Sequence, residues 1–298
     1  MLEAPVSSPA TTYEDGLAKA RAIMARDDAR IGPTAHTTLL DRGSRAPWCA
    51  VLFHGFTNHP GQFAQLGAQI HAAGANVLIP RMPYHGYADR MTDAIKNLTA
   101  KELLKISYEA VDAATGLGER VAVAGLSMGG SISAHLAQYR SDVATSVPIA
   151  PDFGLLKLPR WALAVLAPLA LALPNVFLWW DPRIKEAQLP KTAYPRFSTH
   201  ALMQTVLIGS AVYRMANRAP AKAARIATVV NAHDPAVSNE VTLQVVRRWQ
   251  RLHSSGIEYA ELTDLPKNHD IIDPENPQAR TDLVYPKILE ALALSSRA

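Results

Sequence analysis

The chain has 298 residues, of which 48% are hydrophobic and 19% are charged. This length and hydrophobic content favour one large α/β domain with a sizeable core, and they exclude a globally disordered chain. The net charge of +4 is scattered without a Lys/Arg run, so the sequence gives no support for nucleic-acid binding. The one cysteine, Cys49, lies in an apolar run, so we expect it to be buried, and no disulfide can form within the chain.

The chain begins with a polar arm, rich in Pro, Ser and Thr, that extends to about residue 12. A surface helix is expected over residues 14–28, where Leu17 and Met24 share one face. The opening residues contain neither the basic start nor the apolar stretch of a secretory signal. This favours a cytoplasmic location.

The first half of the chain alternates apolar runs with helical patterns. Apolar residues recur three and four positions apart from Phe63 to Ile70 and from Leu104 to Val111, which predicts two amphipathic helices. Short runs of β-prone residues predict strands at four places: 36–40, 49–53, 75–80 and 121–124.

The second half continues this alternation. Strands are expected at 144–150, 227–232 and 257–262, and an apolar stripe from Val241 to Leu252 predicts a helix. A closing helix contains Ile288 and Leu292, with Pro286 expected near its first turn. Alternating strands and helices predict a mostly parallel, doubly wound α/β sheet with helices on both faces.

The stretch 121–131, VAVAGLSMGGS, carries the strongest chemical signal. It predicts a strand, a sharp turn with Ser127 at its tip, and then a helix, which is the setting of a G-x-S-x-G nucleophile elbow. Gly125 and Gly129 lack a Cβ and so permit the close backbone approach that a strained turn needs. The alternative is a glycine-rich turn that serves only packing.

Several polar residues follow the carboxyl ends of predicted strands, where α/β sheets bind ligands. Asp234 follows one strand and His269 follows the last, and a serine hydroxyl needs a neighbouring base to act as a nucleophile. An ordinary Asp-Pro turn and a solvated loop histidine are the alternatives for these two residues. Asp152 also follows a strand, so it is the alternative to Asp234 as the carboxylate that would pair with the histidine. The remaining candidates are less favoured: Asp270 and Asp273 are too close in sequence to His269, and His253 falls on a surface helix.

Residues 152–222 interrupt the alternation of strands and helices, and the segment from Trp161 to Trp180 has no charge. By length it could span a bilayer. It lies, however, between the strands that carry Ser127 and Asp234, and Pro168 and Pro174 interrupt it. We therefore expect an inserted helical lid. Its apolar residues would line an acyl pocket, form the core of the lid, or contact a lipid surface transiently: Leu163, Leu166, Leu169, Phe177, Trp179 and Trp180.

Three segments, VLFHGFTNHPGQF, IPRMPYHGYADR and VAVAGLSMGG, resemble the carboxylesterase and monoacylglycerol-lipase branch of the α/β-hydrolase superfamily. The resemblance covers roughly residues 45–150 and 224–294 and implies the α/β-hydrolase fold. The chain departs from the usual pattern at Asn58 and Tyr84, where the branch has glycine. Both positions shape loops near the pocket, so the departures bear on substrate preference.

The resemblance implies a role for each candidate residue. Ser127 would be the nucleophile, His269 the base, and Asp234 the acid that orients the imidazole. The backbone N–H groups of Phe56 and Met128 would form the oxyanion hole. A further set is expected to line the substrate pocket: His54, Tyr84, His85, Phe177 and Trp179.

No cofactor or metal is expected. The sequence has no G-x-G-x-x-G or P-loop pattern, and His59, His85 and His233 lack the spaced carboxylates or thiols of a zinc site.

The expected organisation is a hydrolase core in two parts, 1–151 and 223–298, with the lid at 152–222. The first part includes the N-terminal arm and helix within residues 1–30. The expected activity is hydrolysis of carboxylic esters that carry an apolar acyl group. The alternatives are a peptidase, a thioesterase, an acyltransferase, or a non-catalytic small-molecule binding protein of the same fold.

Overall fold

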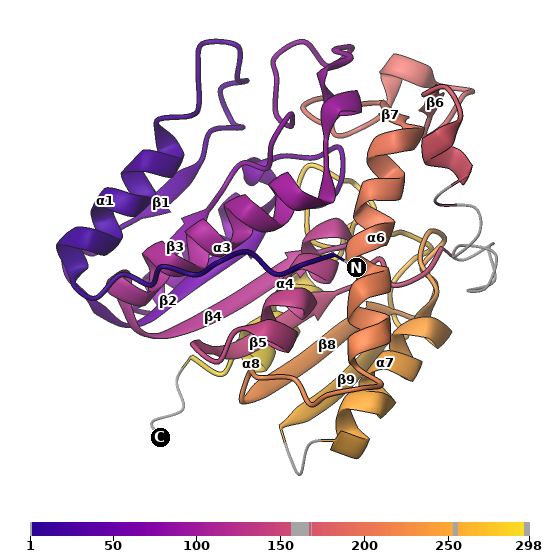
Figure 1. Cartoon of the computed structure of the whole chain (residues 1–298). Helices are drawn as coiled ribbons and strands as arrows, with labels where there is room; N and C mark the ends of the chain where they lie inside the picture. Colours follow the sequence, from indigo (N-terminus) through magenta and orange to yellow (C-terminus); the bar gives the residue numbers. More distant parts are fainter. Residues whose placement is uncertain (1, 156–166, 168, 253–255, 295–298) are drawn as a thin grey trace.

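The computed structural model describes residues 2–155, 167, 169–252 and 256–294. A seven-stranded sheet runs through the molecule in the order β1-β3-β2-β4-β5-β8-β9 (Figure 1). All neighbouring strands are parallel except β1, which is antiparallel to β3. The mostly parallel sheet that the sequence predicts is therefore confirmed. The strands are β1 (Thr38–Leu40), β2 (Ala46–Phe53), β3 (Asn76–Ile79), β4 (Gly118–Leu126), β5 (Val143–Ile149), β8 (Arg225–Asn231) and β9 (Ile257–Leu262).

Helices cover both faces of the sheet because successive strand residues point to opposite sides. In β2, Cys49, Val51 and Phe53 join one core, and the alternate residues Ala50 and Leu52 join the other. The first core includes residues of α1 (Tyr13–Met24), α3 (Ala100–Leu117), α4 (Met128–Tyr139), α6 (Thr199–Met215) and α7 (Asn239–Leu252). The second includes residues of α2 (Ala64–Ala72) and α8 (Thr281–Leu292).

The N-terminal arm does not lie loose. The backbone N–H of Ser8 donates to the Asp112 carboxylate at 2.7 Å, and that of Ala10 donates to the Asp112 carbonyl at 2.8 Å. Asp112 lies on α3, so the arm is held along this helix. The composition of the arm had predicted a loose polar segment, and these long-range hydrogen bonds correct that prediction.

The closing helix begins earlier than the sequence predicts. Helix α8 starts at Thr281, so Pro286 lies inside the helix rather than near its first turn. Its buried side chains Val284, Tyr285 and Ile288 lie on both sides of the proline. The packing of this apolar face against the sheet holds the helix together across a residue that donates no backbone hydrogen bond.

The described part of 152–222 contains more than helix. Helix α6 packs on α4, and β6 (Phe177–Trp179) pairs with β7 (Arg196–Ser198) as a two-stranded antiparallel ribbon. Figure 1 shows this ribbon beyond one end of α6. Several residues named in the sequence predictions lie outside the described residues: Trp161, Leu163, Leu166, Pro168 and His253. Over the described ranges, none of the helices has both the length and the apolar character needed to cross a bilayer.

Candidate active site

Ser127 occupies the turn between β4 and α4, near the middle of the sheet. Its backbone has φ 58° and ψ −111°, a conformation that costs about 1–3 kcal/mol for a residue other than glycine. The turn is possible because its neighbours lack side chains. A Cβ on Gly129 would lie 2.0 Å from the Phe53 carbonyl oxygen, and one on Gly125 would lie 2.3 Å from the Gly129 oxygen. The geometry is that of a nucleophile elbow.

Asp234 and His269 meet beyond the ends of β8 and β9. The Nδ1–H of His269 donates to Oδ2 of Asp234 at 2.7 Å. The other carboxylate oxygen accepts the backbone N–H groups of Ala236 and Val237, at 2.8 and 3.1 Å. These two bonds fix the buried carboxylate and present one oxygen to the imidazole. Nε2 of His269 remains as the ring nitrogen that can take up a proton.

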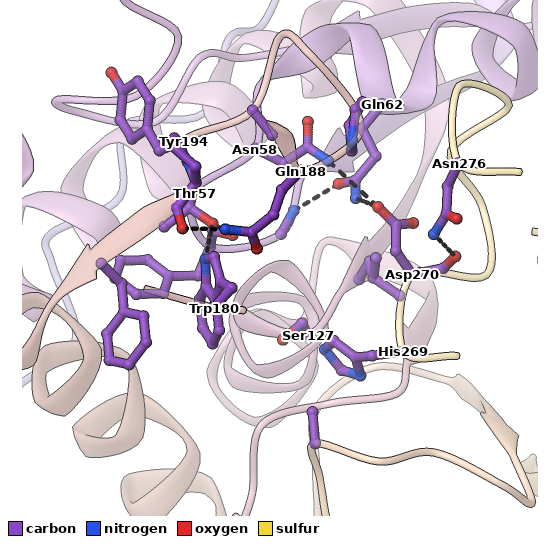
Figure 2. A pocket seen from close by; sticks show the side chains of 18 of the residues that line it. Thr57, Asn58, Gln62, Ser127, Trp180, Gln188, Tyr194, His269, Asp270 and Asn276 are labelled. Carbon is purple, nitrogen blue, oxygen red and sulfur yellow. Dashed lines mark hydrogen bonds between the residues drawn. The ribbon is translucent and has the colours of Figure 1, made fainter. Parts of the chain in front are cut away.

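Ser127 and His269 line the same cavity, which has a volume of about 720 Å³ (Figure 2). This volume lies within the usual range for small-molecule sites. The topology therefore brings together the three side chains that the sequence places after separate strands.

Charges around His269 oppose the effect of its burial. Burial lowers the pKa of its imidazole, but the Asp234 carboxylate raises it through its charge and its hydrogen bond, and Asp270 and Asp152 add to this. The net result is a pKa above the ordinary value of 6.5. The site thus favours the positively charged imidazolium, which is the form that arises when a histidine accepts a proton.

The rival acid, Asp152, takes a different position. It lines the cavity, and its Oδ2 accepts a hydrogen bond from the Thr205 hydroxyl of α6 at 2.9 Å. The hydrogen bond of His269 goes to Asp234. The geometry therefore favours Asp234 as the acid.

His54 organises the loop that follows β2. The Met82 N–H donates to its Nε2 at 3.1 Å, so its Nδ1 carries the proton and donates to the Gly55 carbonyl at 2.9 Å. The Asn58 N–H donates to the same carbonyl at 3.2 Å. Because the N–H of a trans peptide points opposite to its carbonyl, the Phe56 N–H is directed away from both groups.

Phe56 itself lines the cavity. Met128 begins α4, and the first N–H groups of a helix have no acceptor within it. The Met128 N–H therefore has no acceptor within α4, at the position directly after Ser127.

Apolar and aromatic side chains form much of the cavity wall. Among the predicted pocket residues, Trp179 is part of this wall, together with Phe56, Leu155, Trp180, Leu189, Phe197, Leu202 and Val237. Trp180 also donates its indole N–H to the Thr57 hydroxyl at 3.0 Å. The inserted segment therefore contacts the loop that carries Phe56.

The other predicted pocket residues do not line this cavity. His54 and His85 are fully buried, and their rings pack edge to face with centroids 5.1 Å apart. The Tyr84 hydroxyl donates to Glu102 on α3 at 3.0 Å. Phe177 packs beneath the Arg196 guanidinium, 4.5 Å from its ring centroid. Each of these side chains has a partner that holds it away from the cavity.

Two polar residues near the site, Gln62 and Asn231, were not singled out by sequence. Asn231, at the end of β8, donates to the carbonyls of Pro266 and Asn268 at 2.9 and 2.7 Å, which joins the Asp234 strand to the His269 loop. Such contacts span more than 30 positions and leave no local pattern. Across the ranges that the structure describes, no group of three or more His, Cys, Asp or Glu side chains is arranged to hold a metal ion.

The family comparison agrees with this architecture. The model of the alpha/beta hydrolase family matches residues 50–280, and the chain therefore belongs to this family. No curated protein matched the sequence.

Solved structures of similar fold include several lipases. A monoacylglycerol lipase from Paleococcus ferrophilus is 19% identical, with a TM-score of 0.66 over 87% of this chain and 99% of that one. A structure from work on LipS and LipT, two metagenome-derived lipolytic enzymes, is 19% identical, with a TM-score of 0.64 over 88% and 98%. A soluble variant of the Saccharomyces cerevisiae monoglyceride lipase is 14% identical, with a TM-score of 0.62 over 88% and 92%. At these identities the likeness establishes the fold.

Proposed function

We propose that this protein is a serine hydrolase that cleaves carboxylic esters, with Ser127, His269 and Asp234 as its catalytic triad. The observation that carries the proposal is the 2.7 Å hydrogen bond between Asp234 and His269, in a cavity that also exposes the strained elbow serine. A serine hydroxyl is a weak nucleophile until a base removes its proton, and the Asp234–His269 pair supplies that base.

The reaction proceeds in two halves. Ser127 Oγ attacks the ester carbonyl while His269 Nε2 takes the hydroxyl proton, and the N–H groups of Phe56 and Met128 stabilise the oxyanion. The intermediate collapses, and His269 returns the proton to the departing alcohol. In the second half, His269 takes a proton from the water that attacks the acyl-enzyme, and it returns this proton to Ser127 Oγ as the acid leaves. Asp234 stabilises the imidazolium in both halves.

The cavity wall supports an apolar acyl group. Two polar side chains that line the cavity form hydrogen bonds within the protein: the Arg90 guanidinium donates to the carbonyls of Ala193 and Gln188, and the Gln188 amide donates to the Pro195 carbonyl. Trp179, Trp180 and the neighbouring aliphatic residues offer mainly hydrophobic contact. Several structures of similar fold are named as lipases or lipolytic enzymes, which supports the same substrate class.

Hydrolysis of a p-nitrophenyl ester series from acetate to palmitate tests this proposal. We expect turnover by the wild type and a kcat/KM that rises as the acyl chain lengthens beyond acetate, because each buried CH₂ contributes about 0.8 kcal/mol. Ser127→Ala is the control. An absence of turnover with every ester would contradict the proposed activity, and a preference for acetate would contradict the apolar acyl pocket alone.

A further inference from the structure

Gln62 connects two loops of the candidate site. It lies in the short 3₁₀ helix η1 (Pro60–Phe63) and is only 2% exposed. Its side-chain oxygen accepts the Gly55 N–H at 2.8 Å, and its side-chain nitrogen donates to Oδ2 of Asp270 at 2.7 Å. Figure 2 shows the Gln62 and Asp270 side chains joined by this hydrogen bond, with Trp180 on another side of the cavity. One amide thus spans from the loop after β2 to the loop that carries His269.

At the first loop, Gln62 completes a set of bonds around Gly55. Gln62 holds the N–H of this residue, while His54 and Asn58 hold its carbonyl at 2.9 and 3.2 Å. Both peptide groups that flank Gly55 are therefore fixed. The second of them contains the Phe56 N–H, so its direction depends on these bonds.

At the second loop, the Asp270 carboxylate is held at both oxygens. Oδ1 accepts the backbone N–H groups of Ile272 and Asp273 at 3.3 and 3.2 Å, and Oδ2 accepts from Gln62 and from the Asn58 amide at 2.7 and 3.3 Å. Asp270 directly follows His269 in the chain. Fixing this carboxylate therefore restrains the backbone that presents the imidazole.

We propose that Gln62 is a positioning residue for catalysis. It holds the loop after β2, which carries Phe56, and the loop that carries His269 in the relative positions that the reaction needs. The inference rests on the proposed function. The chemistry of the contact requires an amide, because one end must accept a backbone N–H and the other must donate to a carboxylate. Leucine supplies neither group, and glutamate supplies only the acceptor.

The first test compares Gln62→Leu with Gln65→Leu. Gln65 is exposed on α2, so it provides the same substitution three positions away. We expect Gln62→Leu to lower kcat on an ester substrate by roughly tenfold to a hundredfold, with KM within about threefold, because misplaced catalytic groups weaken the transition state more than substrate binding. Gln65→Leu should match the wild type in both constants.

If the Gln62 contacts only stabilise the fold, Gln62→Leu would lower the melting temperature and leave kcat of the folded protein unchanged. The folded fraction of each variant is therefore measured by circular dichroism at the assay temperature. A folded Gln62→Leu variant with kcat within about twofold of the wild type would overturn the inference. Such a result would mean that other contacts hold the catalytic groups in place.

The second test reverses the polarity of the contact. Gln62→Glu places two carboxylates together at this bond, and adding Asp270→Asn restores a donor–acceptor pair. We expect the double variant to recover at least about tenfold in kcat over Gln62→Glu alone, since pairing a buried polar group recovers its desolvation cost. A folded double variant that recovers no kcat over Gln62→Glu would contradict the inference. This test applies even if Gln62→Leu does not fold.

Different results contradict the proposed function and the positioning role of Gln62. A wild type without ester hydrolysis contradicts the proposed function and removes the basis for the inference. An active wild type with unchanged kcat in folded Gln62→Leu contradicts the inference alone.

Discussion

His269 combines a half-buried ring with three carboxylates that act on it. Burial alone lowers the pKa of an imidazole, so the raised pKa reflects Asp234 first and then Asp270 and Asp152. A base must be neutral to accept a proton. The rate is therefore lost as the pH falls through the pKa of His269, which lies above 6.5.

This gives a prediction for Asp270→Asn. Removing the Asp270 charge takes away one group that raises the pKa of His269. The acidic limb of the kcat/KM profile should then move to lower pH, whatever happens to the maximum rate. The profile of kcat/KM against pH for wild type and variant measures this. An acidic limb that stays in place or moves to higher pH would show that Asp270 does not act on the imidazole.

The two candidate acids give a second prediction. Asp234 holds the Nδ1–H of His269, whereas Asp152 holds the Thr205 hydroxyl. Asp234→Asn should lower kcat by roughly 10⁴-fold, because an amide does not stabilise the imidazolium or its correct tautomer. Asp152→Asn should lower kcat by less than about tenfold, because the carboxylate that is hydrogen-bonded to the ring belongs to Asp234, whereas Asp152 acts on the ring through its charge. Steady-state kinetics of both variants measure the two losses of kcat. A larger loss in Asp152→Asn than in Asp234→Asn would make Asp152 the acid.

At the level of elements, the elbow depends on the approach of α4 to β2. A methyl group on Gly129 would overlap the Phe53 carbonyl at 2.0 Å, so either the strand or the helix must move. We expect Gly129→Ala to destabilise the fold by about 3 kcal/mol, in the upper part of the range for overpacked cores.

Gly32→Ala is the matched control for this prediction. A Cβ at Gly32 would have its nearest neighbour at 3.5 Å, and the φ of Gly32 lies outside the left-handed region that favours glycine. Its effect should stay within about 0.5 kcal/mol. Urea unfolding of both variants gives the two free energies. Equal stability would mean that the turn tolerates a side chain at residue 129.

The sequence predicted these elements well where the signal was local. The apolar runs located the strands, and the glycines around Ser127 indicated the tight turn. Pro286 was misleading, because tertiary packing of Val284 and Ile288 extends α8 across it. The pocket wall was harder to predict: Tyr84 and Phe177 are aromatic residues in suitable segments, but Glu102 and Arg196 hold them elsewhere. Gln62 gave no sequence signal, since its two partners lie 7 and 208 positions away.

For the molecule as a whole, the buried carboxylates beside the site affect stability. Burial raises the pKa of Asp273 from 3.8 to about 7, and the nearby Asp270 charge adds to this. A carboxyl whose pKa is raised by folding binds more protons in the folded state than in the unfolded state. Its contribution to stability is therefore present below about pH 4 and is lost as the pH rises to about 7.

Asp273→Asn should weaken this pH dependence, because the amide does not titrate. We expect the stability of the variant to fall less steeply than that of the wild type from about pH 4 to about pH 7. Denaturant unfolding at several pH values within this range measures both slopes. Parallel slopes would mean that Asp273 ionises as readily in the folded protein as in the unfolded chain.

The sheet, its helices and the inserted segment together place Ser127 and His269 in one cavity, where we propose that the imidazole activates the serine. Reaction of the full-length protein with a fluorophosphonate probe, followed by peptide mass spectrometry, tests this most directly. The account predicts covalent labelling of the wild type at Ser127 and no labelling of a folded Ser127→Ala variant. A wild type that stays unlabelled, as expected of a non-catalytic binding protein, or a label that persists in Ser127→Ala, would contradict it.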